Sequence, residues 1–162
     1  MFSRVKKISG FTLIEIILVL LIVAIVSSIV ISRVVSGPDT DMISRIELIK
    51  SHLRYAQSRA MNTNVVWGIC SDNSIYWLFR DGNDHNKVIL PGEDTDTIDL
   101  TAMGISMENF TLSFDSWGVP YADASASSNK KLKAGDSEAQ LKVSSGGEDR
   151  FIDVTPNTGF IP

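Results

Sequence analysis

The sequence is poor in the residues from which most enzyme and metal sites are built. Of its 162 residues, one is cysteine and two are histidine. Cys70 has no partner for an internal disulfide, and we expect it to be a small buried residue in a strand. Gly-x-Ser-x-Gly elbows, phosphate-binding loops, His-Glu-x-x-His pairs and paired cysteines are missing. We therefore expect no catalytic residues, no cofactor and no enzyme activity, and we interpret His52 and His85 as surface polar groups.

Basic residues are also in the minority. The 15 lysines and arginines are outnumbered by 19 aspartates and glutamates, which gives a formal net charge of −4. The first ten residues hold three of the cations, so the chain without them would carry −7. An acidic body disfavours non-specific nucleic-acid binding, and we do not expect nucleic acid as a partner. The alternative is weak DNA binding through one loop cluster: Lys130, Lys131 and Lys133.

One long apolar run dominates the amino-terminal part of the chain. Between residues 11 and 31 the only polar residues are Thr12, Glu15, Ser27 and Ser28. A helix rises about 1.5 Å per residue, so roughly 20 residues span the ~30 Å hydrocarbon core of a bilayer. We predict a single membrane crossing. The cationic leader, with Arg4, Lys6 and Lys7, should stay cytoplasmic, and the chain after the run should lie on the far side.

A small residue precedes this run instead of following it. An ordinary secretory signal has an apolar stretch of roughly 7–15 residues and then a small-residue cleavage site. Here the order is reversed, in the stretch Gly10-Phe11-Thr12-Leu13-Ile14-Glu15. Together with the basic leader, this stretch resembles the prepilin motif of type IV pilins and type II secretion pseudopilins. The resemblance implies that a prepilin peptidase cuts after Gly10 and methylates Phe11, and that Glu15 guides assembly. An uncleaved single-pass anchor with an incidental acid is the alternative.

The same resemblance implies partners and a location. The partners are other pilin or pseudopilin subunits, the prepilin peptidase and an inner-membrane assembly platform. The protein would be single-pass in the bacterial inner membrane, with a periplasmic carboxyl-terminal domain, and filament-associated after assembly. An ionised group without a partner in hydrocarbon is costly, by several kcal/mol. We hypothesise that in a filament the α-amine of a neighbouring Phe11 lies opposite Glu15 and favours one axial register.

A second, amphipathic helix is predicted over residues 37–61. Gly37-Pro38 should break the first helix, and Asp39 or Thr40 should cap the second. Apolar residues then recur at spacings of three or four and mark one buried stripe. The stripe residues are Met42, Ile46, Ile49, Leu53, Ala56 and Ala60.

From residue 62 onward the apolar pattern changes to period two, which predicts strands. The expected strands are 65–70, 74–80, 88–90, 109–114, 141–145 and 150–155, the last two forming a hairpin around Gly146-Gly147. Segment 81–86 is expected to be a polar loop, and the aperiodic segment 116–139 a mobile surface loop.

The predicted fold class is α+β, a long amino-terminal helix packed on an antiparallel β domain. The predicted parts are a prepilin leader at 1–10, a transmembrane and filament-core helix at 11–36, the amphipathic helix at 37–61, and a β-rich periplasmic domain at 62–162.

Four short motifs are similar to segments of H-type minor pseudopilins and FimT-like pilins. They are Tyr55-Ala56-Gln57-Ser58-Arg59-Ala60, Trp77-Leu78-Phe79-Arg80-Asp81, Phe114-Asp115-Ser116-Trp117-Gly118 and Thr155-Pro156-Asn157-Thr158-Gly159. This GspH/FimT-like resemblance implies a β-sandwich on the long helix. It also implies a structural minor pseudopilin whose filament supports protein export by type II secretion. A FimT-like minor type IV pilin, acting in pilus biogenesis, adhesion or DNA uptake, is the alternative.

A short oxygen-rich stretch is a weak candidate for calcium. Asp81, Asn83 and Asp84 supply oxygen ligands of the kind that calcium prefers, and some related pseudopilins bind this ion. The twelve-residue calcium-loop pattern is nevertheless absent, because glycine is second and no closing glutamate fits. We therefore assign no metal site and keep these three residues as candidates to be tested by calorimetry.

Overall fold

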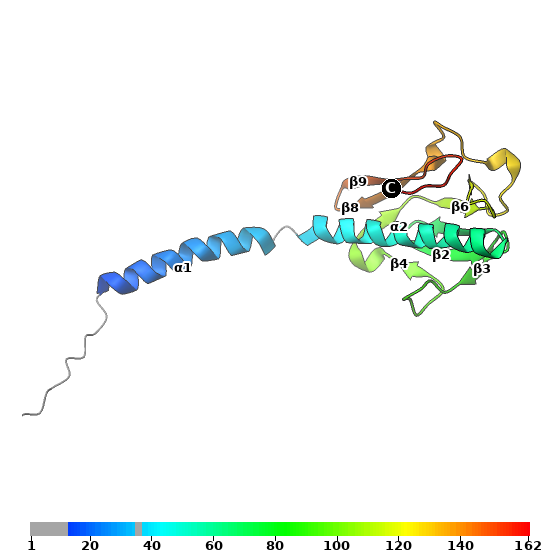
Figure 1. Ribbon diagram of the computed structural model, residues 1–162. Helices are drawn as coiled ribbons and strands as arrows, with labels where there is room; N and C mark the ends of the chain where they lie inside the picture. The colour runs from blue at the N-terminus through cyan, green and yellow to red at the C-terminus, as the bar shows by residue number, and fades with distance from the viewer. Residues whose placement is uncertain (1–12, 35–36) are drawn as a thin grey trace, which may run out of the picture. The chain divides into compact units, whose positions relative to one another are not determined.

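The computed structural model describes residues 13–34 and 37–162, which contain two long helices followed by nine strands (Figure 1). The chain divides into two compact units, Met1–Gly37 and Pro38–Pro162. The first unit holds helix α1 (Leu13–Val34). The helix expected over 11–36 is therefore observed wherever that segment is described, while the leader at 1–10 lies outside the described residues.

A helix with the length and apolar character needed to cross a membrane is not found within the described ranges.

Helix α2 (Gly37–Thr63) begins the second unit. Pro38 falls in its first turn, where the missing N–H removes no intrahelical hydrogen bond. Residues 35 and 36, next to the expected break at Gly37-Pro38, lie outside the described residues. The predicted cap at Asp39 or Thr40 is wrong, because both residues lie within α2. Proline sets a φ that suits the first turn, so it opens this helix instead of preceding it.

The apolar stripe of α2 is buried, as predicted. Its six residues are between 0% and 6% exposed: Met42, Ile46, Ile49, Leu53, Ala56 and Ala60. They share one core with residues of two β-sheets, among them Leu78 and Leu112 of one sheet and Val143 and Ile152 of the other. The helix is thus fixed to the strands by a continuous apolar contact.

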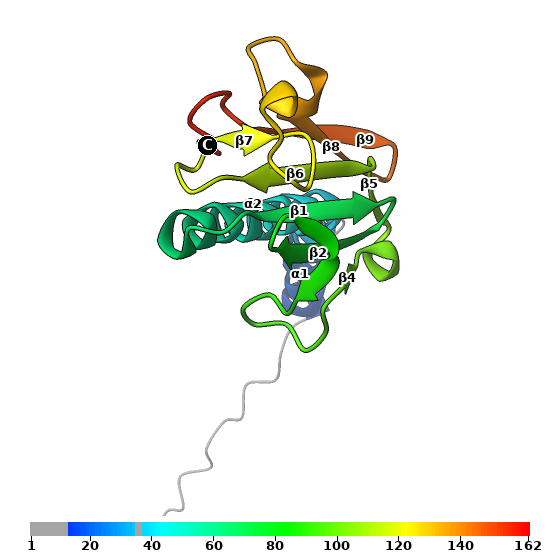
Figure 2. The same ribbon diagram turned by 90° about the vertical axis from the view of Figure 1, so that its right-hand side faces the viewer.

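The strands form two antiparallel sheets (Figure 2). The strands are β1 (Trp67–Asp72), β2 (Ile75–Arg80), β3 (Asn83–Val88), β4 (Ile98–Asp99), β5 (Ile105–Met107), β6 (Phe110–Phe114), β7 (Pro120–Tyr121), β8 (Gln140–Ser145) and β9 (Glu148–Asp153). The larger sheet has the order β3-β2-β1-β6-β7, with β4 also paired to β2, and the smaller sheet has the order β5-β8-β9. The α+β class is therefore confirmed, and so is the hairpin around Gly146-Gly147.

The polar loop expected at 81–86 is wrong, because β3 runs through most of it. Asp81 and Gly82 have φ values of 61° and 65° and form a tight turn between β2 and β3. β3 lies at the edge of its sheet, and its side chains are only partly covered. An edge strand needs no apolar face, so this strand lacks the alternation from which strands are recognised. The short strand expected at 88–90 is likewise only the end of β3 and the residues after it.

His52 is not the surface group that the sequence indicated. Its side chain is buried, with an exposed fraction of 4%, and its Nδ1 lies 3.0 Å from the hydroxyl of the fully buried Tyr76 in β2. Burial lowers the pKa of His52, and the charge of Glu93 opposes that change. His52 follows the stripe residue Ile49 by three positions, so it belongs to the buried face. His85 is exposed, as expected.

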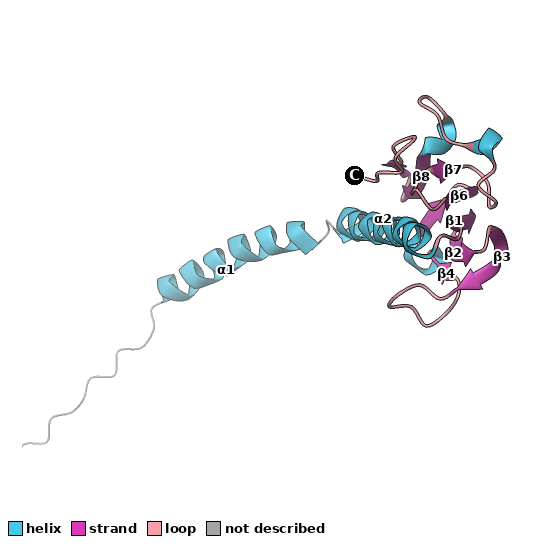
Figure 3. Ribbon diagram, turned by 45° about the vertical axis from the view of Figure 1, so that its right-hand side comes forward, coloured by secondary structure: helices cyan, strands magenta, loops and turns pink. Residues whose placement is uncertain are grey.

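Segment 116–139 contains more structure than expected. It includes β7 and two short 3-10 helices, η2 (Ser128–Lys130) and η3 (Ser137–Ala139) (Figure 3). Leu132 is 1% exposed, and its N–H donates to the carbonyl of Pro120. The segment is therefore anchored to the core in its middle, and its mobility stays a prediction.

Candidate functional site

The residues predicted for processing and assembly lie near the amino terminus. Gly10 and Phe11 fall outside the described residues. Glu15 lies in the first turn of α1, with an exposed side chain. A carboxylate in this position interacts favourably with the helix dipole. The acid therefore sits at the end of α1 that is closer to the predicted cleavage point.

The apolar surface of α1 is open wherever its side chains are described. The exposed fractions of its large apolar residues between Leu13 and Ile25 run from 50% at Ile22 to 77% at Leu13. A helix that is apolar on every side is normally buried, either in a large core or in a membrane. From Leu13 to Ile25, α1 therefore exposes apolar side chains of a kind that proteins usually bury.

A polar junction ties α2 to two distant segments of the chain. The side-chain amide of Gln57 donates to the carbonyl of Gly118 and to that of Thr158, both at 2.9 Å. One turn earlier, Arg54 Nε donates to the carbonyl of Ile161 at 3.1 Å. Three of the motifs that carry the family resemblance, at 55–60, 114–118 and 155–159, therefore meet at one place. Their shared role in this structure is to fix the carboxyl terminus against the helix.

Glycine is required on both sides of this junction. Gly159 has a φ of 65°, and a Cβ placed on it would collide with the Gln57 amide and with the carbonyl of Gly118. Gly118 has a φ of 75° and lies against the side chains of Gln57 and Met61. Neither position accepts a larger residue without displacing the helix contact.

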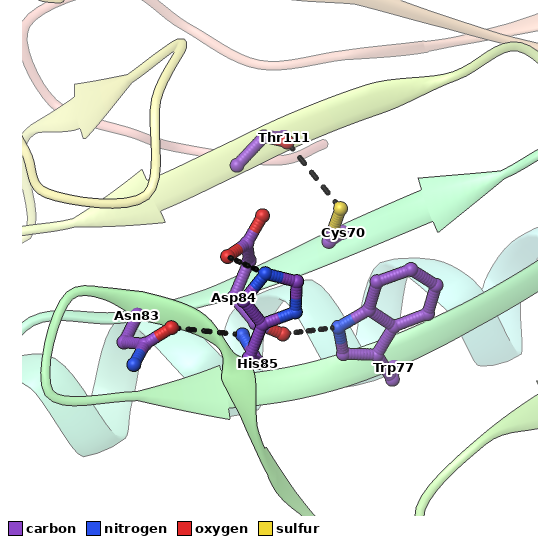
Figure 4. A network of polar contacts seen from close by, with 6 residues as sticks. All are labelled: Cys70, Trp77, Asn83, Asp84, His85 and Thr111. Atoms are coloured by element: carbon purple, nitrogen blue, oxygen red, sulfur yellow. Dashed lines mark hydrogen bonds and ion pairs between the residues drawn. The ribbon is translucent and has the colours of Figure 1, made fainter.

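The three calcium candidates are not brought together. Asn83 Oδ1 accepts a hydrogen bond from the backbone N–H of His85 at 3.0 Å, and Asp81 Oδ2 accepts one from Asn86 at 2.7 Å. Asp84 uses its backbone carbonyl to accept from Trp77 Nε1 (Figure 4).

Because Asn83 and Asp84 are consecutive in β3, their side chains point to opposite faces of the sheet. Within the described ranges, no group of three or more acidic, histidine or cysteine side chains could hold a metal ion. Calcium binding stays a prediction to be measured.

Cys70 is the buried strand residue that the sequence predicts. It lies in β1, and its Sγ is 3.3 Å from the hydroxyl of Thr111 on β6 (Figure 4). Burial raises the pKa of the thiol, while the Thr111 hydrogen bond lowers it. A thiol held in its neutral form is a packing group and not a nucleophile.

Two comparisons bear on both parts of the chain. The family model for the prokaryotic N-terminal methylation motif matches residues 5–31. The family model for the type II transport protein GspH matches residues 45–150, more than half of the chain. The chain belongs to the GspH family. No curated protein and no solved structure matches it.

Membership in the GspH family supports several of the expectations from the sequence. With its methylation motif, this GspH-family chain is a GspH/FimT-like pseudopilin. Pilin and pseudopilin families are structural and not enzymatic, and they assemble from pilin subunits that a prepilin peptidase processes. Membership also indicates a protein anchored in the inner membrane.

The cationic cluster of this GspH-family chain is not a uniform basic surface. Lys131 pairs with Tyr121 in an isolated bridge, and Lys130 ends η2. The shallow depression that the three lysines line also contains Asp136 and Glu138. Acids next to the lysines reduce the attraction that a phosphate backbone would feel.

Proposed function

We propose that the protein is a non-enzymatic minor pseudopilin, a structural subunit of an inner-membrane-anchored filament that supports type II secretion. The observation that carries this proposal is the open apolar surface of α1, in a chain whose second unit has a complete core of its own. Such a helix is suited first to lipid and then to a bundle of identical or related helices. In this proposal residues 11–36 cross the membrane, the leader is cytoplasmic, and residues 62–162 are periplasmic.

Processing is the first step that we propose. A prepilin peptidase removes residues 1–10 by cutting after Gly10, and Phe11 becomes the methylated amino terminus. Mass spectrometry of protein purified from membranes should find Phe11 as the first residue, carrying the mass of one added methyl group. A Gly10→Val variant should keep its leader, because a branched side chain replaces the small residue at the cut. An intact Met1 in the unsubstituted protein would favour the uncleaved anchor instead.

Assembly through Glu15 is the second step. In a filament, the carboxylate of Glu15 and the α-amine of a neighbouring Phe11 would form an ion pair. These two groups meet at only one axial offset between neighbouring helices, and at any other offset each would be a buried charge without an opposite charge beside it. Glu15→Leu should leave membrane insertion intact and reduce incorporation into filaments by at least about tenfold, the effect of only about 1.4 kcal/mol.

A charge-neutral Glu15→Gln variant should behave like Glu15→Leu, whereas the matched apolar change Ile16→Leu should assemble normally. Incorporation is measured by immunoblotting sheared filaments against the membrane fraction. Normal incorporation of both Glu15 variants would show that the carboxylate has no part in assembly.

A FimT-like role in a type IV pilus is separated from secretion by complementation. If the proposal is right, deleting the gene should impair export of secreted proteins and leave twitching motility and DNA uptake unchanged. A gel-shift experiment with residues 37–162 tests the DNA-binding alternative directly, and the acidic composition of this part predicts no shift at physiological salt.

A further inference from the structure

A groove lies between the two sheets, where β6 of the larger sheet faces β8 of the smaller one. Its volume is about 400 Å³, within the range of roughly 300–1,000 Å³ found for ligand sites. Residues 109–111 line one side and residues 140–142 the other. Neither family match assigns a role to this groove, and all of its lining residues belong to the second unit.

The groove begins where the chain crosses from one sheet to the other. β5 pairs with β8, and this ladder continues as far as Glu108, whose N–H donates to the carbonyl of Lys142 at 3.2 Å. The next hydrogen-bonded pair in this register would be Phe110 with Gln140. Phe110 instead pairs with Ser71 of β1, because the chain has entered the larger sheet (Figure 2). The edges of β6 and β8 therefore separate from this point.

Among the described residues, no strand lies beside the first half of the outer edge of β6. β7 pairs with β6 at Ser113 and Phe114 only, and the next hydrogen-bonded position would join Thr111 to Asp123. The pairing of β7 with β6 stops before this position, and on its other edge β7 continues with the N–H of Ala122 donating to the carbonyl of Lys130. In an antiparallel ladder the backbone groups of alternate residues point to the same side. The N–H and C=O of Thr111 therefore face the groove.

The facing edge of β8 is open in the same way. The carbonyl of Lys142 points toward β5, so by the same alternation its N–H and the carbonyl of Gln140 point to that side as well. The N–H of Gln140 donates to Ser137, which leaves its carbonyl directed at the groove. Each side of the groove thus offers strand-type donors and acceptors.

A buried hydroxyl in the lining also lacks a partner. Ser71 is 3% exposed, it lines the groove, and within the described residues its Oγ makes no hydrogen bond. Buried polar atoms in folded proteins are almost always hydrogen-bonded, so such an atom marks a place where a partner is missing. A donor or acceptor on a molecule in the groove would supply it.

The charge around the groove is negative. Glu108 and Glu138 are exposed lining residues, while the lining cation Lys142 is bound to Asp149 at 2.9 Å. The end of this chain is not available to fill the groove, because Ile161 is buried and its carbonyl is held by Arg54. Basic residues on a segment of another protein would therefore favour its binding to this groove.

We propose that this groove binds an extended segment of a second protein, with basic residues flanking a short stretch of alternating character, as a strand inserted between β6 and β8. Strand addition at open sheet edges is a common mode of peptide recognition, in which main-chain hydrogen bonds give affinity and side-chain pockets give specificity. Here both edges of the added strand are bonded, and the two sheets become continuous. The proposal goes beyond the proposed function, and it does not require processing or filament assembly.

The test uses the full chain in detergent micelles and the fluorescein-labelled peptide Lys-Val-Thr-Val-Thr-Val-Lys. Fluorescence anisotropy should show saturable binding, and amide hydrogen exchange at Thr111 and Lys142 should slow when the peptide is bound. N-methylation of the valine amides, or separately of the threonine amides, should abolish binding, because each set faces one edge of the groove. Equal binding of the N-methylated peptides would overturn the proposal, as would no binding at millimolar peptide.

Charge variants give a second readout that does not depend on folding. Glu108→Lys with Glu138→Lys should weaken the basic peptide about threefold to tenfold and strengthen an analogue with glutamate ends. The matched control, Asp94→Lys with Asp96→Lys, makes the same charge change at exposed positions outside the lining and should alter neither affinity. If both pairs of substitutions changed the affinity equally, the binding would be due to general charge attraction and the proposal would be wrong. Concentration-dependent dimers that occlude the peptide would assign the groove to a second copy and would also overturn it.

Discussion

Replacing Tyr76 with phenylalanine should destabilise residues 37–162 through His52. Burial raises the pKa of Tyr76 far above its ordinary value, so the hydroxyl keeps its proton, and its oxygen lies 3.0 Å from Nδ1 of His52. Burial lowers the pKa of His52, which favours the neutral imidazole. Tyr76→Phe removes the hydroxyl and leaves Nδ1 of this buried ring without its hydrogen-bond partner. The expected loss is about 1–3 kcal/mol in the free energy of unfolding at pH 7.

Urea unfolding of the fragment 37–162, followed by circular dichroism, measures this loss. The matched control is Tyr55→Phe on α2, the helix that carries His52. The Tyr55 hydroxyl makes no hydrogen bond within the described residues, and its removal should change stability by less than about 0.5 kcal/mol. Equal effects of the two substitutions would refute the assigned role of the His52–Tyr76 hydrogen bond.

The same pair predicts a pH dependence with a definite sign. Because burial lowers the pKa of His52 in the folded state, the unfolded chain takes up this proton first as the pH falls. The contribution of His52 is therefore fully present above its ordinary pKa of about 6.5 and is lost as the pH falls below that value. Glu93 opposes the shift, and Arg45 acts on Tyr76 in the same region. Stability that rose between pH 7 and pH 5 in the unsubstituted fragment, relative to a His52→Phe variant, would contradict this reasoning.

Three further predictions concern the junction, the turn after β6 and the candidate metal ligands. Gly159→Ala should lower the free energy of unfolding by more than about 3 kcal/mol, because a backbone strain of about 1–2 kcal/mol adds to the collision with Gln57. The control Gly104→Ala has the same φ of 65° and open space around it, so thermal unfolding of this variant should show the strain alone. Asp115→Ala should lower the free energy of unfolding by about 2 kcal/mol, since this carboxylate accepts hydrogen bonds from the N–H groups of Trp117 and Val119 and from the hydroxyl of Tyr121. Asp94→Ala is the surface control, and equal urea midpoints for the two variants would show that these hydrogen bonds do not stabilise the turn. Isothermal titration of calcium into residues 37–162 should give no saturable heat, and a saturable signal lost in Asp81→Asn would restore the calcium site.

The parts of the fold that follow from periodicity could be predicted, and the parts that follow from pairing could not. The stripe from Met42 to Ala60 buries one face of α2, so its apolar pattern carries the information. The alternation at 109–114 likewise predicts β6, although Ser113 on the opposite face from Leu112 and Phe114 is buried as well. β3 and β4 are short or edge strands, held by hydrogen bonds to β2 and not by an apolar face. β5 is only three residues long and is defined by its partner β8. Backbone pairing of this kind leaves little trace in residue type.

The candidate site shows the same division. The predicted processing motif consists of Gly10, Phe11 and Glu15, which are close in the sequence, so it can be recognised from their spacing alone. The Gln57 junction joins residues about 60 and 100 positions apart, and His52 meets Tyr76 across 24 positions. The histidine could have been placed on the buried face from its spacing to Ile49, but its hydroxyl partner could not. The groove between β6 and β8 exists because the β5–β8 and β6–β7 pairings end early, and no sequence motif predicts where these pairings end.

The two units bury their apolar residues in different ways, so substitutions in them should affect different properties of the protein. In residues 38–162 the apolar residues of α2 and of both sheets cover one another, so stability there depends on internal contacts such as the Gln57 junction. In α1 the large apolar residues from Leu13 to Ile25 are at least half exposed, and under the proposed function lipid or neighbouring helices would bury them. Under the proposed function, a change in the second unit therefore alters folding and should leave the packing of α1 with lipid or other helices unchanged. A change at Glu15 should in turn alter assembly and leave the folded second unit intact.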